Sequence, residues 1–187
     1  MSYAERLPLI MEKIPRLFGE PGTVLYIGAN TKWFHLGPQL YKAGHEITVV
    51  EIWPSYIEDI EQHPIRKFMA HLVQGDVREI DEVALPHDRF DWAIWNHGPE
   101  HVAREELGPT VLKLEALARK AVVLGCPWGR VPHGSWRGNP HARHLSYLYP
   151  EDFAAMGYET ACIPPVDVAG GHILAWKYME EADNGIR

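Results

Sequence analysis

The sequence predicts an α/β protein with a mostly parallel sheet that helices cover on both faces. Short apolar runs alternate with amphipathic stretches over the first two thirds of the chain, and this alternation is typical of parallel sheets. The last two apolar runs lie close enough together to pair as an antiparallel hairpin. With 187 residues, 46% of them hydrophobic, the chain can close a core of its own, so we expect one domain over residues 1–187.

The first third of the chain alternates helix and strand patterns. Apolar residues recur at helical spacing in an N-terminal segment (residues 1–19), where Pro15 should kink or end the helix. A buried strand, a helix that ends at Gly44, a second strand and a second helix follow. Their predicted ranges are 23–27, 36–43, 47–51 and 55–62.

The remaining elements continue this order. Two short apolar runs are predicted to be strands. The clearest helix follows, over about Val102 to Arg119, and the spacing of Leu107, Val111 and Leu114 places them on one apolar face. A fifth strand, a long loop rich in Gly and Pro, a short helix that opens at Pro150 and two final strands complete the chain. The predicted ranges of the five strands in this part of the chain are 71–74, 90–95, 121–124, 158–163 and 172–178.

Charge and cysteine content exclude several protein classes. The chain has 18 Lys and Arg against 25 Asp and Glu, a formal charge of −7, which argues against a protein that coats nucleic acid. The apolar runs are shorter than a membrane span and the N-terminus lacks a signal-peptide pattern, so we expect a cytoplasmic protein without membrane contact. Cys126 and Cys162 are expected to be reduced and mostly buried.

Parallel α/β sheets bind ligands at the carboxyl ends of their strands, so we expect the functional residues just after each predicted strand. The loop Gly28-Ala29-Asn30 follows the first strand, and its glycine lets a ligand approach the backbone, although a simple tight turn would use it too. Glu51 closes the second strand 23 residues after Gly28, near the spacing at which an acidic residue binds ribose hydroxyls. We favour this role over that of a solvated carboxylate.

Two later strand ends also carry polar side chains. Asp76 could accept a hydrogen bond from an exocyclic amine while Val77 packs on a purine, or it could cap the next turn. After the fourth strand, the segment Asn96-His97-Gly98-Pro99-Glu100-His101-Val102 holds two imidazoles, an amide and a carboxylate. A structural turn rarely needs so much titratable chemistry, so we favour a function, although Glu100 would also suit the first turn of a helix.

This series of strand ends resembles a class I S-adenosylmethionine-dependent methyltransferase, from about residue 20 to the C-terminal hairpin. The resemblance implies a Rossmann-like three-layer sandwich with seven strands, of which only the last strand position is antiparallel. It implies the cofactor S-adenosyl-L-methionine, with the glycine loop at its methionine part, Glu51 at the ribose and Asp76 at the adenine amine. The implied cofactor-binding residues are Gly28, Ala29, Asn30, Glu51, Ile52, Asp76, Val77, Asn96 and His97. Similar small methyltransferases carry Glu-His-Val where this chain has Glu100-His101-Val102.

The glycine loop departs from the family pattern. The usual acid before the first glycine is Tyr26 here, and the second and third glycines fall on Asn30 and Lys32. Lys32 would either crowd the cofactor or meet its carboxylate, which weakens the individual assignments of Ala29 and Asn30. A glutamate at the ribose also suits NAD, but the missing GxGxxG pattern and the absence of a second domain disfavour that cofactor.

A long loop over residues 126–150 is the predicted substrate or lid segment. Residues 116–150 contain no Asp or Glu, and their Arg and His residues are interleaved with Trp and Tyr, which suits a small anionic or aromatic molecule. The aromatic residues could instead only pack on the body of the protein. The predicted substrate residues are Trp128, Arg130, Arg137, Arg143 and His144. We expect no metal site, because His133, His141 and His144 match no tight ligand template.

The resemblance implies SN2 transfer of a methyl group from a sulfonium to a small-molecule substrate, for which the protein supplies alignment and desolvation. An oxygen nucleophile would also need a base, and the candidate catalytic residues are His97, His144 and His101. Two other functions stay open. The basic and aromatic loop suggests an RNA or protein methyltransferase, although the acidic total disfavours nucleic acid, and the unusual glycine loop suggests a non-catalytic nucleotide-binding module. Exposed Trp residues in the loop could form a homodimer contact.

Overall fold

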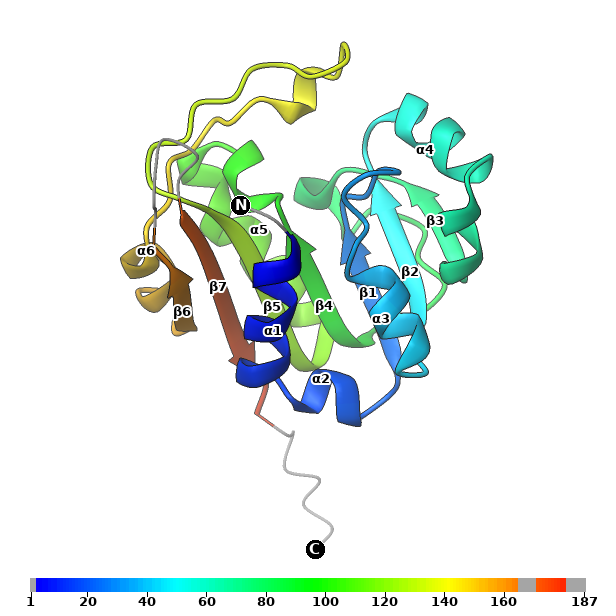
Figure 1. Cartoon of the computed structure of the whole chain (residues 1–187), viewed down its shortest axis with the longest axis horizontal. Helices are drawn as coiled ribbons and strands as arrows, with labels where there is room; N and C mark the ends of the chain where they lie inside the picture. Colours follow the sequence, from blue (N-terminus) through cyan, green and yellow to red (C-terminus); the bar gives the residue numbers. More distant parts are fainter. Residues whose placement is uncertain (1–2, 165–170, 181–187) are drawn as a thin grey trace, which may run out of the picture.

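A computed structural model describes residues 3–164 and 171–180, which form one seven-stranded sheet with helices on both faces (Figure 1). The strand order is β3-β2-β1-β4-β5-β7-β6. β7 runs antiparallel to both of its neighbours, and the other described pairings are parallel, as predicted. The strands are β1 (Thr23–Ile27), β2 (Glu46–Glu51), β3 (His71–Gln74), β4 (Phe90–Asn96), β5 (Ala118–Trp128), β6 (Glu159–Ile163) and β7 (Gly171–Tyr178).

Helices connect most of these strands. The predicted break at Pro15 is confirmed, because α1 ends at Lys13 and α2 begins at Arg16. The α-helices are α1 (Tyr3–Lys13), α2 (Arg16–Gly19), α3 (Gly37–Lys42), α4 (Pro54–Glu61), α5 (Arg104–Leu117) and α6 (Pro150–Ala154). Short 3-10 helices are η1 (Pro64–Phe68), η2 (Val77–Glu79), η3 (Pro99–His101) and η4 (Pro140–Ala142).

Two apolar cores lie on opposite faces of the sheet. Successive side chains of a strand point to opposite faces, so Leu25 and Ile27 of β1 join one core while Val24 and Tyr26 join the other. The first core contains the apolar faces of α5 and α6, and the second contains those of α1, α2 and α3. The protein is therefore a three-layer sandwich, as the alternation of strands and helices predicts.

The fifth strand is longer than its apolar run indicates. The sequence predicts a strand over 121–124 and a loop from residue 126, but β5 continues to Trp128. The reason is tertiary, because Cys126, Pro127 and Trp128 pair with the first residues of β7. The loop that the sequence predicts as a lid, called the lid loop below, therefore begins at Gly129, and the predicted range of 126–150 is wrong at its start.

The lid loop leaves the sheet at the edge where β1, β2 and β4 also end, at the top of Figure 1. This edge gathers the residues that follow each parallel strand. Cys126 is buried in the core and Cys162 is partly buried, and both thiols are free. Within the described part of the chain, no helix has the length and apolar character needed to cross a membrane.

Candidate active site

The turn after β1 is tied to the end of β2. Gly28 adopts a φ of +74°, a left-handed conformation that glycine reaches without strain, and no atom lies within 4 Å of the position that a Cβ would occupy there. The next residue, Ala29, donates its backbone N–H to Glu51 Oε2 at 2.9 Å. Asn30 stays within the turn, where its side-chain oxygen accepts from the backbone N–H groups of Lys32 and Trp33. The turn thus presents open backbone beside a carboxylate.

Glu51 is a buried acid, with 5% of its surface exposed. Its other oxygen, Oε1, accepts the backbone N–H of Trp53 at 2.8 Å. Burial raises the pKa of Glu51 to about 7, even though these backbone hydrogen bonds and one from Ile52 favour the ionised form. Each carboxylate oxygen can accept more than one hydrogen bond, so both keep capacity for a hydroxyl donor.

Asp76 follows β3 and is held by its neighbour. It caps η2 by accepting the backbone N–H of Arg78, and both of its oxygens accept from the Arg78 guanidinium, at 2.6 Å for the shortest contact. Burial acts to raise the pKa of Asp76, but the stronger effect of Arg78 holds it below its ordinary value. Val77 is buried in the first core rather than exposed at the sheet edge.

The residues after β4 bring a third acid and two imidazoles to the same edge. His97 has a φ of +56°, a conformation uncommon for a residue with a side chain and often found at functional sites. Its Nδ1 lies 3.4 Å from Glu100 Oε1, and its Nε2 contacts the guanidinium of Arg6 on α1. Its ring stacks on that of His172, with centroids 5.3 Å apart. Asn96, beside it, packs its side-chain oxygen against Gly125, which leaves no room for a Cβ.

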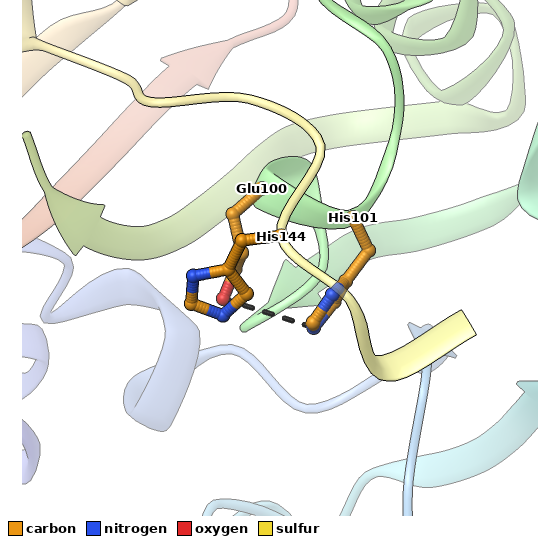
Figure 2. Close-up of side chains that lie close together, drawn as sticks. All are labelled: Glu100, His101 and His144. Carbon is orange, nitrogen blue, oxygen red and sulfur yellow. Dashed lines mark ion pairs between the residues drawn. The ribbon is translucent and has the colours of Figure 1, made fainter. Parts of the chain in front are cut away.

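Glu100 lies at the centre of a compact group with His101 and His144 (Figure 2). Glu100 and His101 come from η3, and His144 comes from the lid loop. The carboxylate is 2% exposed, and one ligating atom from each of the three residues lies within 4.8 Å of the others. Burial acts to raise the pKa of Glu100, but the opposite effect of His97 and His101 is larger and holds the pKa below its ordinary value. The carboxyl is therefore ionised at neutral pH.

The lid loop crosses the sheet edge toward β1 and β2. The Lys32 ammonium lies 5.4 Å from the Trp136 ring, and the Trp53 and His141 rings are 5.9 Å apart. Lys32 therefore faces the lid. A pocket of about 660 Å³ lies within the loop, and His133, Arg143, His144 and Tyr147 are among its lining residues.

The predicted substrate residues divide into two groups. Arg143 and His144 line the pocket, whereas Trp128 ends β5 and packs against the first core. Arg130 and Arg137 are exposed, and their guanidinium groups lie over the rings of Tyr147 and Trp136 at 5.9 and 5.3 Å. Of the five predicted substrate residues, Arg143 and His144 are thus the two that line this pocket.

Sequence reasoning missed two residues of this edge. His172 is 1% exposed and lies under His97, but it sits in the last strand, and only the pairing of β7 with β5 brings it there. Arg6 reaches His97 from α1, and no local pattern signals that contact. The sequence offered three loop histidines as metal ligands. His144 lies in the Glu100 group, His133 stacks on the His144 ring, and His141 lies against Trp53.

The fold is similar to that of several solved structures. The PH0226 protein from Pyrococcus horikoshii OT3 shares 15% identity at a TM-score of 0.64, over 94% of this chain and 90% of that one. A SAM dependent methyltransferase from Archaeoglobus fulgidus shares 17% identity at a TM-score of 0.57, over 92% and 94%.

A third structure contains two bound molecules. The Burkholderia thailandensis 1,6-didemethyltoxoflavin-N1-methyltransferase, solved with 1,6-didemethyltoxoflavin and S-adenosylhomocysteine, shares 18% identity at a TM-score of 0.59, over 91% of this chain and 75% of that one. No protein-family model and no curated sequence matches the chain. The strand order, the antiparallel β7 and these structural matches together show that the chain has the fold of the class I S-adenosylmethionine-dependent methyltransferases.

Proposed function

We propose that this protein is an S-adenosylmethionine-dependent methyltransferase that acts on a small molecule. The observation that carries the proposal is the pairing of the open Gly28 turn with Glu51, which accepts the Ala29 N–H at 2.9 Å. This is the place at which the fold offers backbone and an acid to a nucleoside. Bound structures of the same fold that hold S-adenosylhomocysteine support the choice of cofactor.

The residues at this edge fit the cofactor. The Gly28 turn leaves space above its backbone, and the Glu51 oxygens each keep a lone pair for a ribose hydroxyl. Asp76 would meet the adenine amine while it stays paired with Arg78. When bound, the cofactor supplies a methyl group on a sulfonium.

The protein's own contribution is to align and desolvate the acceptor. Arg143 would attract an anionic group into the pocket of the lid, and His144 lines the same pocket. Burial lowers the pKa of His144, so its imidazole is neutral at pH 7 and keeps one lone pair free. We therefore expect a small anionic acceptor, held by Arg143 beside His144.

Isothermal titration with S-adenosylhomocysteine tests the cofactor site. The wild type should bind, and Glu51→Ala should weaken binding by roughly 10- to 100-fold, because a hydrogen bond to a charged group is worth about 1.5–3 kcal/mol. Glu46→Ala is the matched control, since Glu46 lies at the exposed opposite end of β2. Circular dichroism would check that each variant folds. No heat and no thermal shift at millimolar ligand would refute the proposal, as would unchanged binding by Glu51→Ala.

A labelled-methyl assay tests the substrate class. Cell extract separated into small molecules, RNA and protein would be incubated with the enzyme and methyl-labelled S-adenosylmethionine. We expect label in the small-molecule fraction. Label confined to RNA or protein would overturn the small-molecule assignment, and cofactor binding without transfer to any fraction would point to a binding module.

A further inference from the structure

We propose that Glu100, His101 and His144 bind one divalent transition-metal ion, for which Zn²⁺ is the probe. Three separate features of the structure carry this proposal: the geometry of the three side chains, the hydrogen bonds that fix the tautomers of the two imidazoles, and the buried carboxylate oxygens that lack a hydrogen bond. Metal binding does not depend on the proposed methyltransferase activity.

The geometry suits a small ion. Figure 2 shows the ion pair between His101 and Glu100, in which His101 Nε2 lies 3.9 Å from Glu100 Oε1, with the His144 side chain beside it. Bonds of 2.0–2.2 Å in a tetrahedral zinc site separate the ligand atoms by about 3.4 Å. The three ligating atoms already lie within 4.8 Å of one another, so closure on an ion takes side-chain shifts of only about 1 Å.

Both imidazoles are held in the tautomer that a metal requires. His101 Nδ1 lies 3.1 Å from the Arg143 carbonyl oxygen, and His144 Nδ1 lies 2.6 Å from the Val131 carbonyl oxygen. A carbonyl oxygen only accepts hydrogen bonds, so each Nδ1 is the donor and carries the proton. Each Nε2 of a neutral ring then keeps its lone pair. Such a hydrogen bond from the second ring nitrogen to a carbonyl is typical of metal-ligating histidines.

Imidazoles lie beside the buried Glu100 carboxylate, with His97 Nδ1 at 3.4 Å and His101 Nε2 at 3.9 Å from Oε1. Within residues 3–164 and 171–180, both of its oxygens are buried without a hydrogen bond. Buried polar atoms are normally hydrogen-bonded, and a buried carboxylate without hydrogen bonds is costly. A cation bound between Glu100 and the two imidazoles would remove this cost.

The backbone fixes the two halves of the group against each other. Leu145 and Ser146 donate their backbone N–H groups to the Glu100 carbonyl oxygen at 2.8 and 3.1 Å. The Ser146 hydroxyl donates to the Val102 carbonyl oxygen at 2.7 Å. These three bonds hold the lid segment beside η3, so His144 faces Glu100 although it lies 44 positions after Glu100 in the chain. The site is therefore preorganised.

Three protein ligands leave at least one coordination position open, as in catalytic zinc sites. His144 also lines the lid pocket, so the open position is within reach of a molecule bound there. On the proposed function, which this step rests on, we infer that an oxygen of the methyl acceptor would occupy it. Coordination to the ion would make a hydroxyl at that position more acidic.

Metal titration of the full chain tests the site. Protein dialysed against EDTA would be titrated with Zn²⁺ by calorimetry, and Co²⁺ would report ligand geometry through its visible absorption. We expect one equivalent of each ion to bind. Replacing one ligand should weaken binding by on the order of 100-fold, since even second-layer partners contribute 10- to 100-fold. The variants are Glu100→Gln, His101→Ala and His144→Ala, and His141→Ala from the same loop is the matched control.

Thermal unfolding distinguishes a variant that has lost metal binding from one that has failed to fold. Circular dichroism should show that Glu100→Gln folds without metal. With Zn²⁺ the melting temperature of the wild type should rise and that of Glu100→Gln should not, since only the wild type binds the ion. A wild type that binds neither ion, or His144→Ala that binds as tightly as His141→Ala, would overturn the metal site. Titration with S-adenosylhomocysteine is separate, so failure of one proposal leaves the other intact.

Discussion

The buried Glu51 makes stability depend on pH in a way that one substitution isolates. The pKa of Glu51 is about 7 in the folded protein, against an ordinary value of 4.5 for the unfolded chain. Between these values the folded protein holds a proton that the unfolded chain has released. The free energy of unfolding therefore falls as pH rises through this range and levels off above about pH 7. The whole effect is about 3 kcal/mol, of which about 2.5 kcal/mol falls between pH 5 and 8.

Urea unfolding of the wild type and of Glu51→Gln would measure this term. Glutamine does not titrate, and its weaker hydrogen bonding to Ala29 and Trp53 adds an offset that does not change with pH. The 11 histidines titrate in both proteins, so their contribution cancels in the difference. The seven tryptophans provide the fluorescence signal. The wild type should lose about 2.5 kcal/mol relative to the variant from pH 5 to 8. Parallel stability curves would refute a folded-state pKa of about 7 for Glu51.

Two further predictions concern the core around the site. Burial, together with nearby His97 and Arg6, holds the pKa of His172 well below its ordinary value of 6.5. As pH falls below about 6.5, the His172 imidazole takes up a proton in the unfolded chain before it does so in the folded protein, so the wild type loses stability. His172→Phe should lose less between pH 7 and 5 in urea unfolding, and an equal loss would contradict a neutral buried imidazole. Gly125→Ala should cost about 1–3 kcal/mol, because its Cβ would lie 2.3 Å from Asn96 Oδ1. The control Gly19→Ala, at the end of α2 with no atom beyond its chain neighbours and helix backbone within 4 Å of the Cβ position, should gain up to about 1 kcal/mol. Calorimetric melting of both variants would show whether the two changes have opposite signs.

Much of the fold follows from local patterns. β1 and β3 have the predicted bounds, because Thr23–Ile27 and His71–Gln74 are short apolar runs between turn residues. The meeting of Gly28 and Glu51 was also predictable. Parallel strands that pair in register, with Ile27 opposite Val50, end at the same edge and bring the following residues together.

Other features depended on contacts that no local pattern contains. The apolar run of β5 ends near Leu124, and only pairing with β7 extends the strand to Trp128 and moves the start of the lid. Glu100 could be read as a favourable charge at a helix start, since nothing in its neighbours shows that the lid will bury it.

The sequence by itself therefore determined the layers, the strand ends and the residue types at the ligand-binding edge, because hydrophobic periodicity and turn chemistry act over a few residues. Only the tertiary structure decided which of those residues share a site. His144 reaches Glu100 through backbone hydrogen bonds of the lid, and His172 reaches His97 through the register of β7. Such contacts join residues far apart in the chain, and their geometry exists only after the sheet has formed.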